Sequence, residues 1–464
     1  MTGSGPAEDP PALAVPVPAT VDGPVAVPRA GEPAPEGSGD AGIGHGAPPG
    51  SKGRVAVLGS AQLVAGIGVA SAVSVGGLLA EAISGTAAYA GLPQTGSVLG
   101  AALMAVPLAR LAGRAGRRPA LALGFALAAV GAGVALTSAA VESLVLLVLG
   151  CLLVGAGMAA GLQARFAATD GVADRHRGVV LSIVVWASSI GAILGPNLIE
   201  PGAALGTRLG ILPLGGPWIF ACVALLIAAG VVLVGLRGTR PATPPAKRRI
   251  LDTVRATWAH PSGRLGLVAM ATGHAVMVGV MAMSSVHLHG HGSSLRFIGL
   301  VISAHVAGMY LLAPVFGWLA DRRGAGWVVG LGAVTLLVGC AGTAASGWVD
   351  AGHGSHRTAE ALATAGLVLI GLGWSAVTVA AATLIAVLSH HGRAAPTDVQ
   401  GVADLTMGLA GATAGILSGV ALAGLGYAGL SAAGAILLLP LVALLASGRR
   451  ARRRGDAAGE PAKV

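Results

Sequence analysis

The chain has 464 residues, of which 54% are hydrophobic and only 10% are charged, and its formal net charge is +10. Soluble globular proteins carry about 25% charged residues, so this composition excludes an ordinary soluble fold and requires a surface that mostly faces lipid. The basic residues lie in short segments between apolar runs, which indicates membrane topology and argues against a nucleic-acid-binding surface.

Residues 1–54 precede the first apolar run and are rich in Pro, Gly and Ala without apolar periodicity. This composition predicts a disordered cytoplasmic tail. The polar segment before the first apolar run is too long for a secretory signal peptide, and the apolar run itself is long enough to span a bilayer. We therefore expect the first helix to remain as a membrane anchor.

The apolar runs that follow predict an all-α membrane protein with twelve transmembrane helices, because a spanning helix needs about 20 apolar residues. The predicted helices are 55–80, 93–112, 119–139, 142–165, 178–199, 216–236, 265–286, 297–319, 326–347, 360–388, 400–424 and 428–447. They form two pseudo-symmetric six-helix bundles over 55–236 and 265–447. A polar cytoplasmic linker at 237–264 joins the bundles, and a basic cytoplasmic tail follows at 448–464.

The distribution of basic residues predicts the orientation. All of the 29 Lys and Arg residues except Arg208, Arg296 and Arg357 fall in segments that share one side of the membrane with the N-terminus. The positive-inside rule places that side in the cytoplasm. An even number of helices puts the C-terminus there as well, so we predict a multi-pass protein of the plasma (inner) membrane with both termini cytoplasmic.

A short motif occurs twice, each time between the second and third apolar runs of its bundle. The second copy reads Gly-Trp-Leu-Ala-Asp-Arg-Arg-Gly and contains Gly317, Asp321, Arg322 and Gly324. The first copy keeps Arg114, Gly116, Arg117 and Arg118 but has Gly113 in place of the Asp. A six-helix unit written twice is the construction of a transporter and not of an enzyme.

On these residues the chain resembles a twelve-helix transporter of the major facilitator superfamily over about 55–447. The Gly-x-x-x-Asp-Arg-x-Gly pattern matches the loop motif of that family. The run Gly191-x-x-x-Gly195-Pro196 in the fifth helix is similar to the signature of its proton-linked exporters, although Ile199 and Glu200 stand where further glycines are usual. The same glycines also fit ordinary small-residue packing between membrane helices.

The loop motif predicts a latch between the two bundles. A carboxylate at a helix end is attracted to the N-terminus of a neighbouring helix, so we expect Asp321 to face the start of the fifth helix near Arg177 and Gly178. Since the first copy lacks its Asp, we predict that Asp404 pairs with Arg114 or Arg117. The alternative is that Asp404 only caps its own helix.

Few ionisable residues fall inside the predicted helices, where such groups are costly and tend to be functional. Glu81, His274 and His305 are candidates for proton transfer. The alternatives are solvation of Glu81 among outer headgroups and imidazoles satisfied by backbone carbonyls. No Arg or Lys falls near the middle of a run, which argues against phosphate or multi-carboxylate cargo.

Further side chains are candidates for lining a cargo cavity, because Met and Trp adapt to apolar and amphipathic molecules. Their alternative role is helix packing. These candidates are Gln62, Trp186, Asn197, Met281, Trp374 and Thr378.

His287, His289 and His291 form a cluster at the outer end of the seventh helix. If helical, His287 and His291 share a face at i, i+4 spacing and can hold a metal. The glycines between them and the lack of a nearby Cys, Asp or Glu in the sequence favour a solvated loop instead. We therefore predict no metal site.

Together these features predict a secondary active transporter, proton-coupled, that exports a small amphipathic organic compound by alternating access. The alternatives are an importer of a neutral metabolite and a non-transporting membrane sensor. The sequence has no phosphate-binding loop, so energy is expected from an ion or cargo gradient. We expect no enzymatic activity, no cofactor and no nucleic-acid partner. The expected partners are the cargo, protons and lipid, and the expected state is a monomer.

Overall fold

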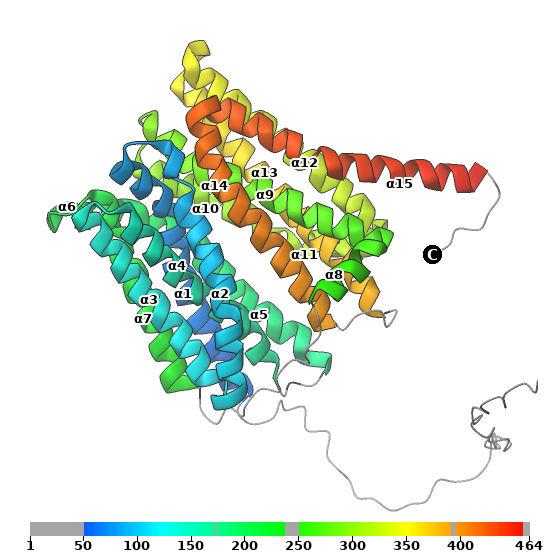
Figure 1. Cartoon of the computed structure of the whole chain (residues 1–464), viewed down its shortest axis with the longest axis horizontal. Coiled ribbons are helices and arrows are strands. Elements are labelled where there is room, and N and C mark those ends of the chain that lie inside the picture. Colours follow the sequence, from blue (N-terminus) through cyan, green and yellow to red (C-terminus); the bar gives the residue numbers. More distant parts are fainter. Residues whose placement is uncertain (1–50, 171, 173, 237–249, 391–395, 458–464) are drawn as a thin grey trace, which may run out of the picture. The chain divides into compact units, whose positions relative to one another are not determined.

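The computed structural model describes residues 51–170, 172, 174–236, 250–390 and 396–457, and all their secondary structure is helical (Figure 1). This confirms the predicted all-α membrane class. Most of the predicted tail 1–54, much of the linker 237–264 and the end of the basic tail lie outside the described residues.

The first half contains six long helices and four short ones. The long helices are α1 Ser51–Ser84, α2 Leu92–Ala115, α3 Arg117–Val141, α4 Leu144–Thr169, α5 Asp174–Leu194 and α7 Pro217–Gly235. The short ones are η1 Ala87–Tyr89, η2 Gly195–Leu198, α6 Ile199–Arg208 and η3 Pro213–Gly215. The fifth predicted helix therefore ends in a tight turn at Pro196, because proline cannot continue the hydrogen-bond ladder of an α-helix.

The second half begins with the short helix α8 Ile250–Ala259, which occupies part of the predicted linker. The remaining elements are α9 Pro261–Gly290, α10 Leu295–Leu311, α11 Ala313–Arg323, α12 Ala325–Trp348, η4 Val349–His353, α13 His356–His390, α14 Pro396–Leu437 and α15 Leu439–Ala457. The eighth predicted helix is thus divided into α10 and α11, and Pro314 follows the division.

Eleven stretches of the described chain are long and apolar enough to cross a membrane. The last, Gly401–Gly448, has 48 residues, which is about twice what one crossing requires. It is interrupted at Gly426, whose φ of 67° breaks the helix between the predicted runs 400–424 and 428–447. The last stretch therefore has room for two crossings.

Small residues let the helices approach closely inside each half. A Cβ on Gly131 of α3 would lie 2.5 Å from the carbonyl oxygen of Gly150 on α4, and one on Gly339 of α12 would lie 2.9 Å from that of Gly366 on α13. Large apolar side chains such as Val145 and Val234 are about 70% exposed. Packing by glycine inside and large aliphatic residues outside is the pattern of a lipid-facing bundle.

We call the end of the helices where α1 begins the terminal face and the end where α1 finishes the loop face. The two halves are joined near the loop face. Thr95 Oγ1 of α2 donates to the carbonyl oxygen of Ala412 of α14 at 2.9 Å, and Asn197 Nδ2 of η2 donates to Ser303 Oγ of α10 at 2.8 Å. Near the terminal face Gly178 and Asp321 are exposed, and a Cβ on Gly178 would have no neighbour within 4 Å.

Candidate functional site

Three ring-bearing side chains from different helices of the second half meet in one cluster. Trp374 Nε1 of α13 donates a hydrogen bond of 3.0 Å to His274 Nδ1 of α9. Tyr310 of α10 packs edge-on against Trp374 with ring centroids 6.2 Å apart. Because Nδ1 of His274 accepts, the neutral imidazole carries its proton on Nε2.

The first half contributes Arg165 of α4, which interacts electrostatically with Tyr310. The Nε of Arg165 is buried and has no hydrogen-bond partner within the described chain. One turn earlier, the carbonyl oxygen of Gly161 accepts from Gln62 Nε2 of α1 at 2.9 Å. We call His274, Tyr310 and Trp374 of the second half, together with Arg165 of the first half, the central cluster.

Arg165 lies near the end of the fourth helix, as the sequence predicts. The predicted helix ends at residue 165, and α4 continues to Thr169. The electrostatic interaction of Arg165 with Tyr310 of the other half was not predicted. The signal available in the sequence was an arginine two residues after Gln163, near the end of an apolar run.

Gly411 of α14 packs against the ring of His274. A Cβ on Gly411 would lie 3.1 Å from both Cδ2 and Nε2 of the His274 ring. His274 is half-buried, so the imidazole is not sealed in the core. The absence of a side chain at Gly411 leaves the ring room on the side opposite to Trp374.

The other predicted cavity residues fall in different places. Asn197 is part of the contact between the halves, and Trp186 is 42% exposed on α5. Thr378 is half-buried on α13. Met281 lines a separate cavity of about 20 Å³ between the halves, which is the size of a water molecule. Of this group Trp374 is part of the central cluster, and Gln62 bonds to α4 one turn before Arg165.

Two predicted proton carriers lie outside the central cluster. His305 of α10 is fully buried, and its Nδ1 is 2.6 Å from the carbonyl oxygen of Leu367. Glu81 is half-buried near the loop face and forms no ion pair with another described residue. Of the three ionisable candidates, His274 is the one that joins a group of polar side chains from both halves.

The two copies of the loop motif have the same backbone turn. Gly116 joins α2 to α3 with φ 94°, and Gly324 joins α11 to α12 with φ 88°. Positive φ is strained for residues with a Cβ, which explains the glycine at the end of each copy. The repeat read from the sequence is therefore also a repeat of local structure.

The charged groups of the motif are paired differently from the prediction. Asp321 is exposed and has no ionic or hydrogen-bonding partner among the described residues, so its predicted contact near Arg177 and Gly178 is not formed in this conformation and stays a prediction for another one. The halves meet near the loop face, which leaves this part of the terminal face uncovered. Arg322 and Arg323 instead lie over the rings of Trp318 and Trp327 at 4.5 and 5.7 Å from their centroids.

In the first copy, Arg117 Nε pairs with Asp170 Oδ2 at 3.0 Å. Asp170 follows the last residue of α4, so the acid comes from the same half. Arg114 and Asp404 are both exposed, and a pairing between them stays a prediction. The sequence offered no periodic signal for Asp170, because it lies in a loop.

The glycine-proline run of the fifth helix packs against α1. A Cβ on Gly191 would collide with the carbonyl oxygen of Leu63, and one on Gly195 would lie 2.7 Å from that of Ile67. The carbonyl oxygen of Pro196 would lie 2.6 Å from a Cβ on Gly299 of α10. This run therefore sits where α1, α5 and α10 approach one another.

The histidines at the end of α9 do not form the solvated loop that was expected. The helix continues to Gly290, His287 is buried, and Asp350 of η4 lies beside it. The sequence showed no acid nearby because Asp350 is separated from His287 by three helices.

Comparison with known proteins assigns the family. The model of the Major Facilitator Superfamily matches residues 58–293. The chain is 34% identical over 400 residues to the MFS-type transporter YdeG of Bacillus subtilis, covering 83% of this chain and 89% of that protein. It is 27% identical over 397 residues to the riboflavin transporter RfnT of Brucella anthropi, covering 84% and 94%.

Among solved structures, the fold is similar to a bacterial homologue of the human lysosomal transporter Spinster. The TM-score is 0.61 at 17% identity, covering 86% of this chain and 95% of that one. The family model, the 34% identical relative and the shared fold agree. The chain belongs to the major facilitator superfamily of membrane transporters.

Proposed function

We propose that the protein is a secondary active transporter that exports a small amphipathic organic compound in exchange for protons. The observation that carries the proposal is the central cluster, in which His274, Trp374 and Tyr310 of one half contact one another and Tyr310 interacts electrostatically with Arg165 of the other half. Transporters of this class bind cargo between their halves. Alternating access requires cargo contacts from both halves, and the central cluster offers them.

The chemistry of the cluster suggests the class of cargo. Trp374 and Tyr310 offer ring faces and edges for a planar apolar body. The unpartnered Nε of Arg165 offers one hydrogen-bond donor to an acceptor on the cargo. A planar amphipathic molecule with one accepting or weakly anionic group meets both requirements.

The bond between Trp374 and His274 suggests how a proton is coupled to transport. In the neutral ring Nδ1 accepts from Trp374, whereas an imidazolium has no free lone pair and both nitrogens donate. Protonation of His274 at Nδ1 therefore breaks this hydrogen bond and releases Trp374. We propose that cargo binds while Trp374 is held by neutral His274 and leaves when protonation releases Trp374. Binding of a proton and binding of cargo then exclude each other, which gives antiport.

In the orientation that we propose for the protein in the membrane, the terminal face lies in the cytoplasm. Arg114, Arg118 and Arg322 are exposed at that face, and the positive-inside rule assigns such residues to the cytoplasm. The plasma membrane, with both termini cytoplasmic, is the corresponding location. With the halves joined near the loop face, this conformation is the one that takes up cargo from the cytoplasm.

Everted membrane vesicles with an inward-acid pH gradient test the proposal. A panel of planar amphipathic compounds is added, and the gradient is followed with a pH-quenched dye. We expect at least one compound to dissipate the gradient with the wild-type protein and not with His274→Ala. The control His289→Ala changes an exposed histidine at the end of α9 and is expected to behave as wild type. A panel without any protein-dependent signal would overturn proton antiport.

A second candidate is uptake of a neutral aromatic metabolite on the same fold. It is supported by the similarity to a protein named as a riboflavin transporter and by the ring-bearing side chains of the central cluster. Whole-cell accumulation of labelled riboflavin separates the two candidates. Uptake that depends on the protein favours import, whereas lower accumulation in expressing cells favours export.

A further inference from the structure

The end of α9 presents two histidines on one face at a fixed spacing. His287 lies in the last turn, and His291 is the C-cap, whose backbone N–H bonds to the carbonyl oxygen of His287 at 3.2 Å. Gly292, at φ 87°, reverses the chain, and the N–H of Ser293 bonds to the carbonyl oxygen of Leu288 at 2.9 Å. This is the Schellman arrangement, which fixes the last turn and hence the position of His291 relative to His287.

An acid from another element completes a group of three. Asp350 of η4 places Oδ2 2.9 Å from His287 Nε2. The ligand atoms of His287, His291 and Asp350 all lie within 4.8 Å of one another. His287 is buried, so the contact between its Nε2 and Asp350 Oδ2 is shielded from water. A buried imidazole nitrogen that faces a carboxylate oxygen can hold either a proton or a metal ion between the two atoms.

The groups around these three residues hold them in place. His291 Nδ1 lies 2.8 Å from the carbonyl oxygen of His287, so it donates there and leaves Nε2 with a free lone pair. The ring of His287 stacks on Tyr427 at 4.1 Å and 13°. Tyr427 is held in turn by a 2.7 Å hydrogen bond to Ser284. Ligating histidines in metal sites are oriented by such outer contacts.

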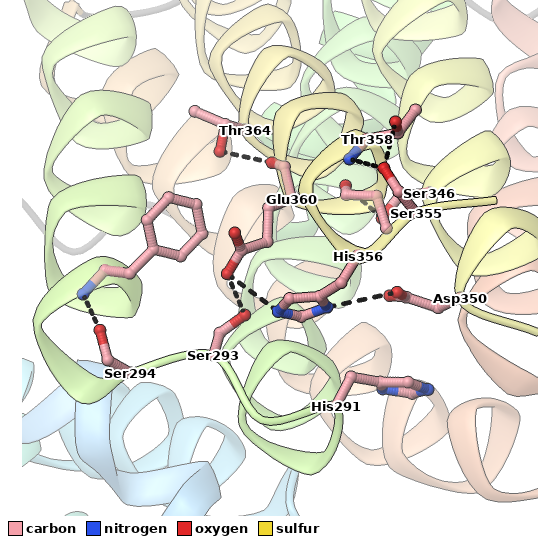
Figure 2. A network of polar contacts seen from close by, with 12 residues as sticks. His291, Ser293, Ser294, Ser346, Asp350, Ser355, His356, Thr358, Glu360 and Thr364 are labelled. Carbon is pink, nitrogen blue, oxygen red and sulfur yellow. Dashed lines mark hydrogen bonds and ion pairs between the residues drawn. The ribbon is translucent and has the colours of Figure 1, made fainter.

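The carboxylate is oriented from its other side. Figure 2 shows Asp350, His356 and Glu360 in a row, with His291 beside Asp350. His356 Nδ1 lies 3.8 Å from Asp350 Oδ1, and its Nε2 lies 3.2 Å from Glu360 Oε1. Ser293 donates to that same oxygen at 2.7 Å, which ties the row back to the end of α9.

We propose that His287, His291 and Asp350 form a binding site for a divalent transition-metal ion of the Zn²⁺ type. Two imidazoles and one carboxylate suit Zn²⁺, Co²⁺ or Ni²⁺ and do not suit Ca²⁺ or Mg²⁺, which require oxygen ligands. Zinc–nitrogen bonds of about 2.0–2.1 Å place tetrahedral ligand atoms about 3.3 Å apart. His291 is exposed at the end of the helix, so its side chain can turn toward the other two ligands while the backbone of the last turn stays fixed. We expect water in the fourth coordination position.

The ion has a structural consequence at the loop face. It ties the end of α9 to η4 and adds to the contact between His287 and Asp350. On the preceding turns of α9, Ala282 and Val286 approach Gly77 of α1, so the site borders the contact between the halves. The site is separate from the central cluster, and its ion is neither cargo nor part of the proton step.

Cobalt titration of the purified full-length chain, without an affinity tag, tests the site. We expect one Co²⁺ per chain, with the intense visible absorption of a four-coordinate ion, and competition by Zn²⁺. His291→Ala and Asp350→Asn are each expected to weaken Co²⁺ binding at least about tenfold. The matched control is His289→Ala, which removes an exposed histidine of the same turn and is expected to bind as wild type.

Three results would overturn the site: no Co²⁺ absorption with the wild-type chain, binding that His291→Ala and Asp350→Asn leave unchanged, or an equal loss in His289→Ala. Since His291 is exposed, its alanine variant is expected to melt without metal at the wild-type temperature. Added Zn²⁺ is expected to raise the melting temperature of wild type and not of His291→Ala. The melting temperature measured with added Zn²⁺ thus tests the same site independently of the cobalt absorption.

Discussion

At the scale of single residues, the hydrogen bond from Trp374 to His274 is the most informative contact of the central cluster. Trp374→Phe keeps an aromatic ring and removes the Nε1–H donor, so His274 loses the group that selects its tautomer. A hydrogen bond contributes about 0.5–1.5 kcal/mol, so we expect proton-coupled transport to fall by about 2- to 10-fold. The measurement is the initial rate of gradient dissipation in everted vesicles.

The control for this substitution is Trp327→Phe on α12. Trp327 is 42% exposed and contacts Arg323, away from the central cluster. Its replacement is expected to leave the transport rate within a factor of two of wild type. Equal rates in both variants would remove Trp374 from the proposed coupling.

The glycine that ends the second copy of the loop motif permits a backbone prediction. Gly324→Ala places a Cβ at φ 88° and is expected to destabilise the protein by about 1–2 kcal/mol. Gly326→Ala, two residues later inside α12, meets no atom within 4 Å and is expected to stabilise by up to about 1 kcal/mol. Thermal unfolding in detergent measures both, and melting temperatures that shift in the same direction would contradict the backbone explanation.

At the scale of elements, the approach of α5 to α1 depends on Gly191. A methyl group there would collide with the carbonyl oxygen of Leu63, so the two helices must separate. We expect Gly191→Ala to cost about 1–3 kcal/mol or more, as overpacking does, and to lower the yield of folded protein. Size-exclusion chromatography and thermal unfolding measure the effect.

Gly230 of α7 is the matched control for Gly191. It too lies inside a long helix of the first half, but a Cβ there would have no neighbour within 4 Å. Gly230→Ala is expected to retain or slightly raise the melting temperature. If Gly191→Ala behaved in the same way, the close packing of α1 and α5 would not be required for the fold.

At the scale of the whole molecule, we expect the contacts between the halves near the loop face to stabilise the conformation that is closed at that face. Thr95→Val removes the hydrogen bond to the carbonyl oxygen of Ala412 while keeping the side-chain shape. A bond of about 0.5–1.5 kcal/mol corresponds to about a 2- to 10-fold rise in the population that is open at the loop face. Ser285→Cys, at the small cavity between the halves, reports that opening through its rate of thiol labelling.

The control for Thr95 is Thr137→Val on α3. Thr137 Oγ1 bonds to the carbonyl oxygen of Gly133 within its own helix and is not part of the contact between the halves. Labelling of Ser285→Cys is expected to be unchanged by Thr137→Val. Faster labelling in Thr137→Val, or unchanged labelling in Thr95→Val, would show that the bond to Ala412 does not hold this face closed.

The membrane class, the positions of most helices and the repeated loop motif followed from the sequence. Hydropathy is a local property, so an apolar run long enough to span a bilayer marks its helix wherever it packs. The matching glycines of the two copies, Gly116 and Gly324, were also visible in the sequence, and the structure shows that both have positive φ. These features need no knowledge of which helices are neighbours.

The partners of the polar side chains were decided by tertiary structure alone. Trp374 bonds to His274, Arg165 interacts electrostatically with Tyr310, Arg117 pairs with Asp170, and Asp350 lies beside His287. Such pairs depend on how each helix is rotated about its axis and on how far the two halves are closed. Helices rich in Ala and Gly on all sides carry little periodic signal for that rotation, so only the packed structure shows which polar groups meet.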